Sequence, residues 1–227
     1  VGWNLVLEYT VTASAVASGW SGYVTGLLLS AGIDPGHALT SVPADGGIIN
    51  LPAICITLLL SFFLIRGTQE SSKINRILVF VKLAAVFIFL LLAGPQVNTA
   101  NWEPFMPFGM QGIAAGAAIV FFAYIGFDAV ATTAEECKNP ARDLPIGIIG
   151  SLIICTLLYV VVAGVLTGIV PYTELNSPEP VAYALRYIGY NLGSALVGVG
   201  AIAGITTVLL VLLYGQARIF FAMSRDG

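Results

Sequence analysis

Charged side chains are scarce in this sequence of 227 residues, where they make up 9% of the total. A soluble domain carries about 25%. Hydrophobic residues make up 58%, and the mean hydropathy is +0.93. A soluble globular domain is therefore excluded. The formal net charge of -3, without a long basic run, gives no basis for a nucleic-acid partner. We expect an integral membrane protein whose surroundings are membrane lipid.

Cysteine and histidine are also rare, with three cysteines and one histidine in the chain. Cys55 and Cys155 fall in apolar segments and Cys137 in a polar loop, so their spacing fits neither a disulfide framework nor a metal motif. His37 lies in another polar loop. The apolar segments contain no nucleophile and base set and no glycine-rich phosphate loop. We therefore expect neither an enzyme nor a metal or organic cofactor.

Six apolar segments approach the length of about 20 residues that a bilayer requires. The predicted spans are about 2–30, 48–65, 77–93, 110–137, 144–170 and 192–214. A short amphipathic helix is expected over Pro180–Tyr190, before the last span. The predicted fold class is an all-α, multi-pass membrane domain over residues 1–227. Because the sequence opens at Val1 inside an apolar segment, we expect it to be part of a longer chain.

Positive charges are distributed unevenly over the connecting segments. Three of these segments together carry seven basic residues: Arg66, Lys73, Arg76, Lys138, Arg142, Arg218 and Arg225. The alternate segments carry only Arg186, and Lys82 lies within a span. The positive-inside rule places the seven residues in the cytoplasm. We expect a plasma-membrane protein whose fourth span runs from outside to inside.

The fourth span changes character near its middle, where Gly126 and Asp128 interrupt the apolar run. An ionisable group at that depth is costly unless it faces water or a site. We predict a helix broken near residues 123–127. Its freed carbonyl groups would attract a cation and its freed amides an anion, as a transporter needs for a zwitterion. Asp128 either determines specificity or caps the second half-helix.

Two further charged residues lie inside spans. Lys82 either extends its ammonium group toward the cytoplasm or is a buried amine that binds and releases a proton. Glu8 lies at a similar depth in the first span. It either pairs with Lys82 and relays a proton or makes a structural hydrogen bond. After the broken span, Asp143 is expected to be the N-cap of the next helix, with Pro145 in its first turn.

Three stretches of the sequence resemble the cationic amino acid transporter family, within the amino acid–polyamine–organocation superfamily. The run FFAYIGFDAV at 121–130, followed by EECKNPARDLPIGI at 135–148, is similar to that family's sixth span and the loop after it. Residues 2–9 and 17–22 resemble its third span. Residues 206–218 and 223–227 resemble its eighth span, so the resemblance covers the whole chain.

The resemblance implies a LeuT-like fold of two inverted five-helix repeats, of which this chain would supply spans three to eight. It implies that the carbonyl groups of Phe122, Ala123 and Ile125, around Gly126, bind the amino group of the substrate, and that the Phe122 ring covers the site. Lys82 matches a lysine that takes the place of a coupling sodium, so a proton would be the coupling ion.

Two threonines complete the predicted site. The resemblance places Thr206 and Thr207 where the eighth span approaches Lys82. From the residues alone, each hydroxyl is equally well explained by a hydrogen bond to a preceding carbonyl of its own helix.

The predicted function is import of an amino acid together with a proton by alternating access. A small neutral or a cationic amino acid fits the sequence. The alternatives are a membrane receptor that senses an amino acid without transport and a sodium-coupled or exchanging carrier of the same fold. A channel is disfavoured because the sequence has no ring of charges or filter motif. The oligomeric state is left open.

Overall fold

The computed structural model describes residues 2–66, 71–126 and 139–226. All named elements in these residues are α-helices or 3₁₀ helices. The all-helical class is therefore confirmed for the described part of the chain. The contacts divide the protein into two units, Val1–Gln96 with Thr173–Gly227, and Val97–Tyr172. Each unit is described by itself.

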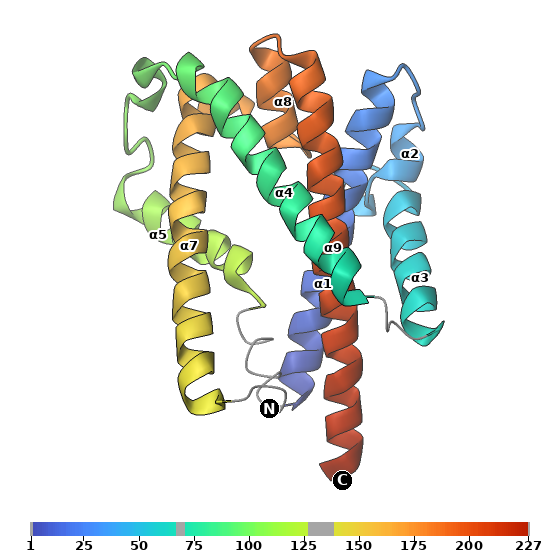
Figure 1. Ribbon diagram of the computed structural model, residues 1–227. Helices are drawn as coiled ribbons and strands as arrows, with labels where there is room; N and C mark the ends of the chain where they lie inside the picture. The colour runs from blue at the N-terminus through green and yellow to red at the C-terminus, as the bar shows by residue number, and fades with distance from the viewer. Residues whose placement is uncertain (1, 67–70, 127–138, 227) are drawn as a thin grey trace. The chain divides into compact units, whose positions relative to one another are not determined.

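The first unit is built mainly from long helices (Figure 1). Its elements are α1 (Gly2–Ser30), α2 (His37–Thr40), η1 (Pro43–Asp45), α3 (Leu51–Arg66), α4 (Ser71–Ala93), η2 (Gly94–Gln96), α8 (Pro180–Tyr187) and α9 (Asn191–Asp226). The second unit holds η3 (Thr99–Trp102), α5 (Gly109–Val120), η4 (Phe121–Tyr124) and α7 (Pro140–Ile169). The 3₁₀ turn η6 (Tyr172–Glu174) stands at the boundary between them.

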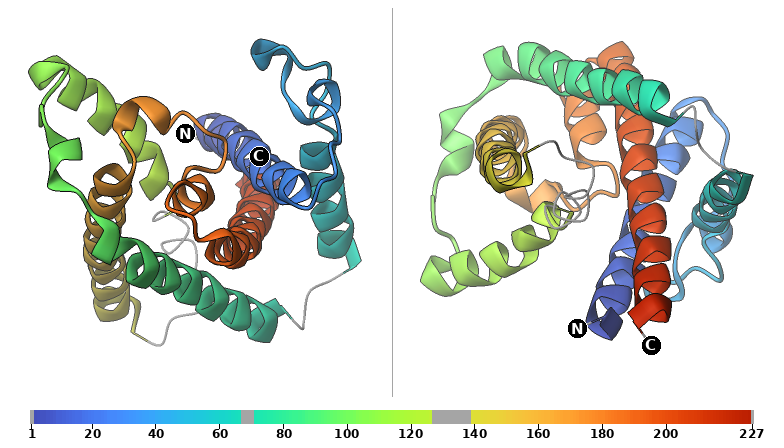
Figure 2. Two further views of the ribbon diagram at one scale, coloured as in Figure 1. Left: turned by 90° about the horizontal axis from the view of Figure 1, so that it is seen from above. Right: turned by 60° about the horizontal axis from the view of Figure 1, so that its bottom comes forward.

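Helix α9 organises the first unit, since it lies between α1 and α4 (Figure 2). Glycines on α9 allow these neighbours to approach closely. A Cβ atom at Gly215 would lie 2.6 Å from Cε1 of Tyr9 on α1. A Cβ atom at Gly204 would lie 3.1 Å from Cβ of Lys82 on α4. Small residues at such positions let membrane helices pack through dispersion contacts, because lipid removes the hydrophobic drive between helices.

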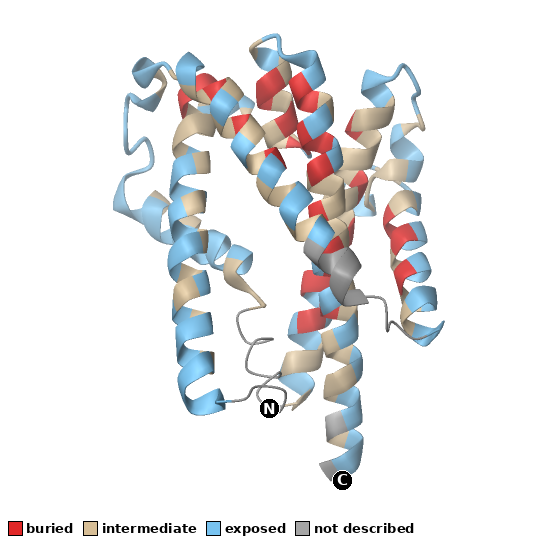
Figure 3. Ribbon diagram, in the orientation of Figure 1, coloured by how far each residue is buried: buried red, intermediate tan, exposed pale blue. Residues whose placement is uncertain are grey.

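The buried core of this unit lies where α1, α3 and α9 meet, and Figure 3 shows buried positions on all three helices. Its members are Tyr9, Ala13, Ala17, Ala53, Ile56, Leu60, Leu209 and Leu212. Tyr9 is the largest fully buried side chain, with a relative exposure of 1%. The alanines of α1 recur at a spacing of four residues, which places them on one helix face with Tyr9.

Most of α7 exposes apolar side chains, among them Ile149, Ile153, Leu157 and Val160. Three helical segments of the described residues are long and apolar enough to cross a membrane: Ile77–Gln96, Pro140–Ile169 and Asn191–Arg225. Helix α1 has the length of a span, whereas α3 and the α5–η4 segment are shorter apolar helices. A membrane protein is thus supported, and six complete crossings stay a prediction.

The expectation for Asp143 was wrong. Helix α7 begins at Pro140, with Asn139 at the N-cap position, so Asp143 lies inside the first turn. Proline suits the first helical position because its missing N–H would have no intrahelical partner there. Pro145 is accommodated within the helix. Asp143 still carries a negative charge near the helix N-terminus, where the helix dipole favours it.

Candidate functional site

The helical path of the fourth predicted span is interrupted between Val120 and Gly126. Helix α5 ends at Val120, and η4 continues as a tighter turn to Tyr124. Ile125 then leaves the helical region with φ −57° and ψ 132°, and Gly126 has a φ of +112°. L side chains rarely adopt the conformation of Gly126, so glycine fits this position. The interruption overlaps residues 123–127, where the sequence predicts a break.

Two of the three carbonyl groups expected to bind the substrate already accept a hydrogen bond. The Phe122 oxygen accepts from the backbone N–H of Ile125 at 3.2 Å. The Ala123 oxygen accepts from the hydroxyl of Tyr159 on α7 at 3.0 Å. A carbonyl oxygen has two lone pairs, so each retains the capacity to accept a second donor. The Phe122 side chain is 39% exposed within this chain.

Helix α7 supports η4 through a small aromatic and hydroxyl cluster. The rings of Tyr124 and Tyr159 meet edge to face, with centroids 5.3 Å apart. The Tyr124 hydroxyl lies 2.9 Å from Oγ1 of Thr156, one turn before Tyr159. Tyr159 and Thr156 therefore hold both the backbone and a side chain of η4. Sequence reasoning missed both residues. The only available signal was polar atoms in an apolar span, where a tyrosine hydroxyl usually finds a partner.

The predicted coupling residues lie in the first unit. Lys82 is half-buried on α4, and its aliphatic stem packs against Gly204 of α9. Thr207 is 3% exposed, and its hydroxyl donates to the Gly204 carbonyl oxygen at 2.7 Å. Lys82 of α4 thus contacts α9 beside the stretch that carries Thr206 and Thr207. The residues that the structure describes provide no hydrogen-bond or ion-pair partner for the Lys82 ammonium group.

The hydroxyl of Thr206 makes two hydrogen bonds. It donates to the Ile202 carbonyl oxygen at 2.7 Å, as a helical threonine commonly does. It also accepts a hydrogen bond from the indole Nε1 of Trp20 on α1 at 2.9 Å. Thr206 therefore joins α1 to α9 at nearly the level where Lys82 contacts α9. Trp20 did not appear among the site residues expected from the sequence.

The structure does not bring Glu8 and Lys82 together. Glu8 is exposed, and the adjacent Tyr9 contacts α9 at Gly215. Lys82 contacts α9 at Gly204, eleven residues earlier, which is about 16 Å of helix. A direct Glu8–Lys82 pair is therefore absent from the described residues. Asp128 falls in the range 127–138, outside the part of the chain that is described.

The predicted residues thus form two separate groups. Phe122, Ala123, Ile125 and Gly126 belong to the second unit, whereas Lys82, Thr206 and Thr207 belong to the first. The first group offers carbonyl oxygens that accept from an ammonium group. The second group holds an amine whose aliphatic stem packs against Gly204, two and three residues before the two threonines. In the described residues, no cluster of three His, Cys, Asp or Glu side chains could hold a metal ion.

Comparison with known proteins agrees with the family resemblance of the sequence motifs. Residues 1–227 match the family model described as amino acid permease. The chain is 48% identical to the methylthioribose transporter of Bacillus subtilis (strain 168) over 229 residues, which is 100% of this chain and 50% of that protein. It is 47% identical over 232 residues to the branched-chain amino acid permease BcaP of the same organism, again 100% of this chain and 50% of the relative.

A plant protein is also similar. The chain is 40% identical over 230 residues to the chloroplastic cationic amino acid transporter 9 of Arabidopsis thaliana, covering 99% of this chain and 40% of that protein. The chain therefore spans about half the length, or less, of the curated relatives it matches. The family resemblance that the sequence motifs indicate is confirmed.

Proposed function

The chain belongs to the amino acid permease family, and from that premise we propose that the full-length protein is a secondary active transporter of an amino acid. The observation that carries the proposal is the interrupted helix from Phe121 to Gly126. Its turn presents the backbone oxygens of Phe122, Ala123 and Ile125 outside a regular α-helix. Carbonyl groups at such a break suit the ammonium group of an amino acid.

The proposed coupling ion is a proton carried by Lys82. Its side chain lies against α9 at Gly204. Placing an ionisable group inside a span costs free energy, so a residue of this kind is by default a candidate functional residue. An ammonium group at this position supplies one positive charge, as a bound sodium ion would. Loss of the proton during the transport cycle removes that charge, and this couples movement of the proton to movement of the amino acid.

The proposed substrate class is small neutral or cationic amino acids. Relatives of comparable similarity carry names for a branched-chain amino acid permease and for cationic amino acid transporters. Another relative, 48% identical, is named a methylthioribose transporter. Methylthioribose has no amino group, so a site built around an ammonium group should discriminate against it. It is therefore an informative competitor in transport assays.

Counterflow tests whether the protein is a carrier. Vesicles containing the full-length protein and unlabelled alanine should transiently accumulate external labelled alanine, because a carrier exchanges one molecule for another across the membrane. The same vesicles loaded with arginine test the cationic substrate class. A receptor that only senses an amino acid would show binding without accumulation. A pore would equilibrate the label without an overshoot, so either result would contradict the proposal.

A further inference from the structure

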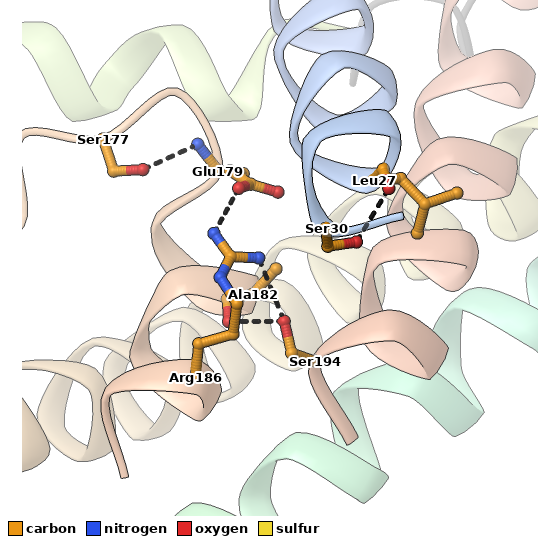
Figure 4. Close-up of polar contacts among 7 residues, drawn as sticks. All are labelled: Leu27, Ser30, Ser177, Glu179, Ala182, Arg186 and Ser194. Atoms are coloured by element: carbon orange, nitrogen blue, oxygen red, sulfur yellow. Dashed lines mark hydrogen bonds and ion pairs between the residues drawn. The ribbon is translucent and has the colours of Figure 1, made fainter. Parts of the chain in front are cut away.

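A cavity of about 560 Å³ in the first unit is lined by two opposite charges, Glu179 and Arg186. It lies where the end of α1, helix α8 and the start of α9 meet (Figure 4). Leu27 and Ser30 of α1 and Leu192 and Ser194 of α9 form further parts of its wall. Small-molecule pockets in proteins usually measure about 300–1,000 Å³. None of these residues belongs to the site proposed above.

The carboxylate of Glu179 is buried against α1, with only 9% of its side chain exposed. Its carboxylate carbon and oxygens occupy the space that a Cβ atom would take at Gly26. The preceding Pro178 packs against Gly22 in the same way, one helical turn earlier. The glycine face of α1 thus fixes the negative charge on one wall. Burial of a carboxylate is costly unless a positive group compensates it.

Arg186, in the last turn of α8, supplies that positive group. It forms an ion pair with Glu179, and its Nη1 donates to Oγ of Ser194 at 3.1 Å. Ser194 is buried and donates in turn to the Ala182 carbonyl oxygen at 2.8 Å. These contacts, drawn in Figure 4, hold the guanidinium beside the first turn of α9. The amide groups of a helix N-terminus also favour a negative ligand.

The carboxylate therefore lies on the α1 side of the cavity and the guanidinium contacts α9, and the two groups meet as an ion pair. The Arg186 side chain is 30% exposed, and a guanidinium has five N–H donors, so it can bind a second anionic group. A ligand with both an ammonium and a carboxylate group can pair with Glu179 and Arg186 together. It replaces one internal ion pair by two pairs and leaves no buried charge without a partner. Leu27 and Leu192 provide apolar surface for a side chain.

We propose that this cavity is a second binding site for an amino acid zwitterion, separate from the interrupted helix. Arg186 and the first turn of α9 bind the ligand carboxylate, and Glu179 binds its ammonium group. The ligand class follows from the two charges and the cavity. The positive-inside distribution of charges assigns Arg186 and this cavity to the external face.

The test measures the stoichiometry of bound labelled alanine on the full-length protein in nanodiscs. The lipid is phosphatidylglycerol only, so that no zwitterionic headgroup competes. Four proteins are compared: wild type, Gly126→Val, Ser30→Trp and the double variant. Gly126→Val removes the interrupted-helix site under the proposed function. Ser30 is exposed at the cavity wall, and a tryptophan there is chosen to obstruct the cavity while both charged residues are kept.

The control for the tryptophan is Ser224→Trp. Ser224 is also exposed, and it makes the same kind of back-bond as Ser30, to Phe221 at 2.8 Å as against Leu27 at 2.7 Å. We expect two bound equivalents for wild type and for Ser224→Trp, one for each of the two site variants, and none for the double variant. In the Gly126→Val background, Arg186→Gln and Glu179→Gln should each weaken the remaining binding at least tenfold.

The outcomes separate this inference from the proposed function. A single equivalent in wild type that is lost in Gly126→Val and kept in Ser30→Trp overturns the second site and leaves the proposed function intact. A single equivalent that is lost in Ser30→Trp and kept in Gly126→Val supports the second site and contradicts the interrupted-helix site. Absence of saturable alanine binding in wild type overturns both.

Discussion

The hydroxyl of Tyr159 on α7 donates a hydrogen bond to the carbonyl oxygen of Ala123 in η4, with the two oxygens 3.0 Å apart. The contact joins residues 36 positions apart in the sequence. It satisfies a carbonyl group that the interruption of α5 withdraws from regular helical bonding. Lipid cannot satisfy such groups, so non-helical backbone in a membrane needs partners from protein or water. Tyr159 is therefore a positioning residue for the proposed substrate site.

Replacing Tyr159 with phenylalanine should weaken substrate binding. The ring contact with Tyr124 is retained, but the Ala123 carbonyl loses its donor and its orientation. A hydrogen bond contributes about 1 kcal/mol net, which corresponds to roughly a fivefold increase in Kd. Isothermal titration with the transported amino acid measures the change. Tyr172→Phe is the matched control, because its ring contacts Phe108 edge to face in the same unit. Equal affinities for the two variants would show that the Tyr159 hydroxyl has no positioning role.

Replacing Gly126 with valine should abolish substrate binding at the interrupted helix while the protein still inserts and folds. A Cβ atom at Gly126 meets no atom within 4 Å, so the effect comes from its φ of +112° and not from a clash. A β-branched residue there costs about 1–3 kcal/mol or shifts the backbone. The control is Gly116→Val, since Gly116 lies within α5 and is equally open. The number of bound equivalents is measured on monodisperse protein, and an undiminished number in Gly126→Val would refute the interrupted-helix site.

Replacing Thr206 with valine should destabilise the packing of α1 on α9. The change removes the acceptor of the Trp20 indole N–H, which is partly buried between the helices. Interhelical hydrogen bonds in membranes contribute about 0.6–2 kcal/mol, so we expect the Tm to fall by about 2 °C. Thr167→Val is the control, because Thr167 bonds only to carbonyl groups of its own helix. A similar Tm for both variants in a thermal unfolding assay would argue against this role of Thr206.

Hydropathy located the long helices but not all of their ends. Helix α1 ends at Ser30, where the predicted span ends. Helix α4 begins at Ser71, six residues before the predicted span, and α9 continues to Asp226. The α4 extension is largely polar, so it carries no hydropathic signal, whereas Gln216, Arg218 and Arg225 interrupt the α9 extension. Helix α7 begins at Pro140 since proline is favoured in a first turn, a signal that the sequence contained.

The site was predictable only where the signal is local. Gly126 interrupts an apolar run, so the break can be read from neighbouring residues. The Tyr159–Ala123 and Trp20–Thr206 contacts depend on packing between distant segments, which one sequence does not reveal. A direct Glu8–Lys82 pair, one of the two alternatives for Glu8, is absent from the described residues for a related reason. Equal depth in two spans does not determine which helices are neighbours. Helix α9 contacts Tyr9, next to Glu8, at Gly215 but contacts Lys82 at Gly204.

The most direct test of the account is uptake of labelled alanine and arginine into proteoliposomes that contain the full-length protein. Uptake is measured with and without an inward proton gradient, for wild type and Lys82→Ala, with unlabelled methylthioribose as a competitor. We predict that the gradient drives accumulation by wild type, that Lys82→Ala loses this drive, and that methylthioribose competes weakly. The account would be contradicted if neither amino acid is transported. It would also be contradicted if accumulation requires sodium and does not depend on the proton gradient.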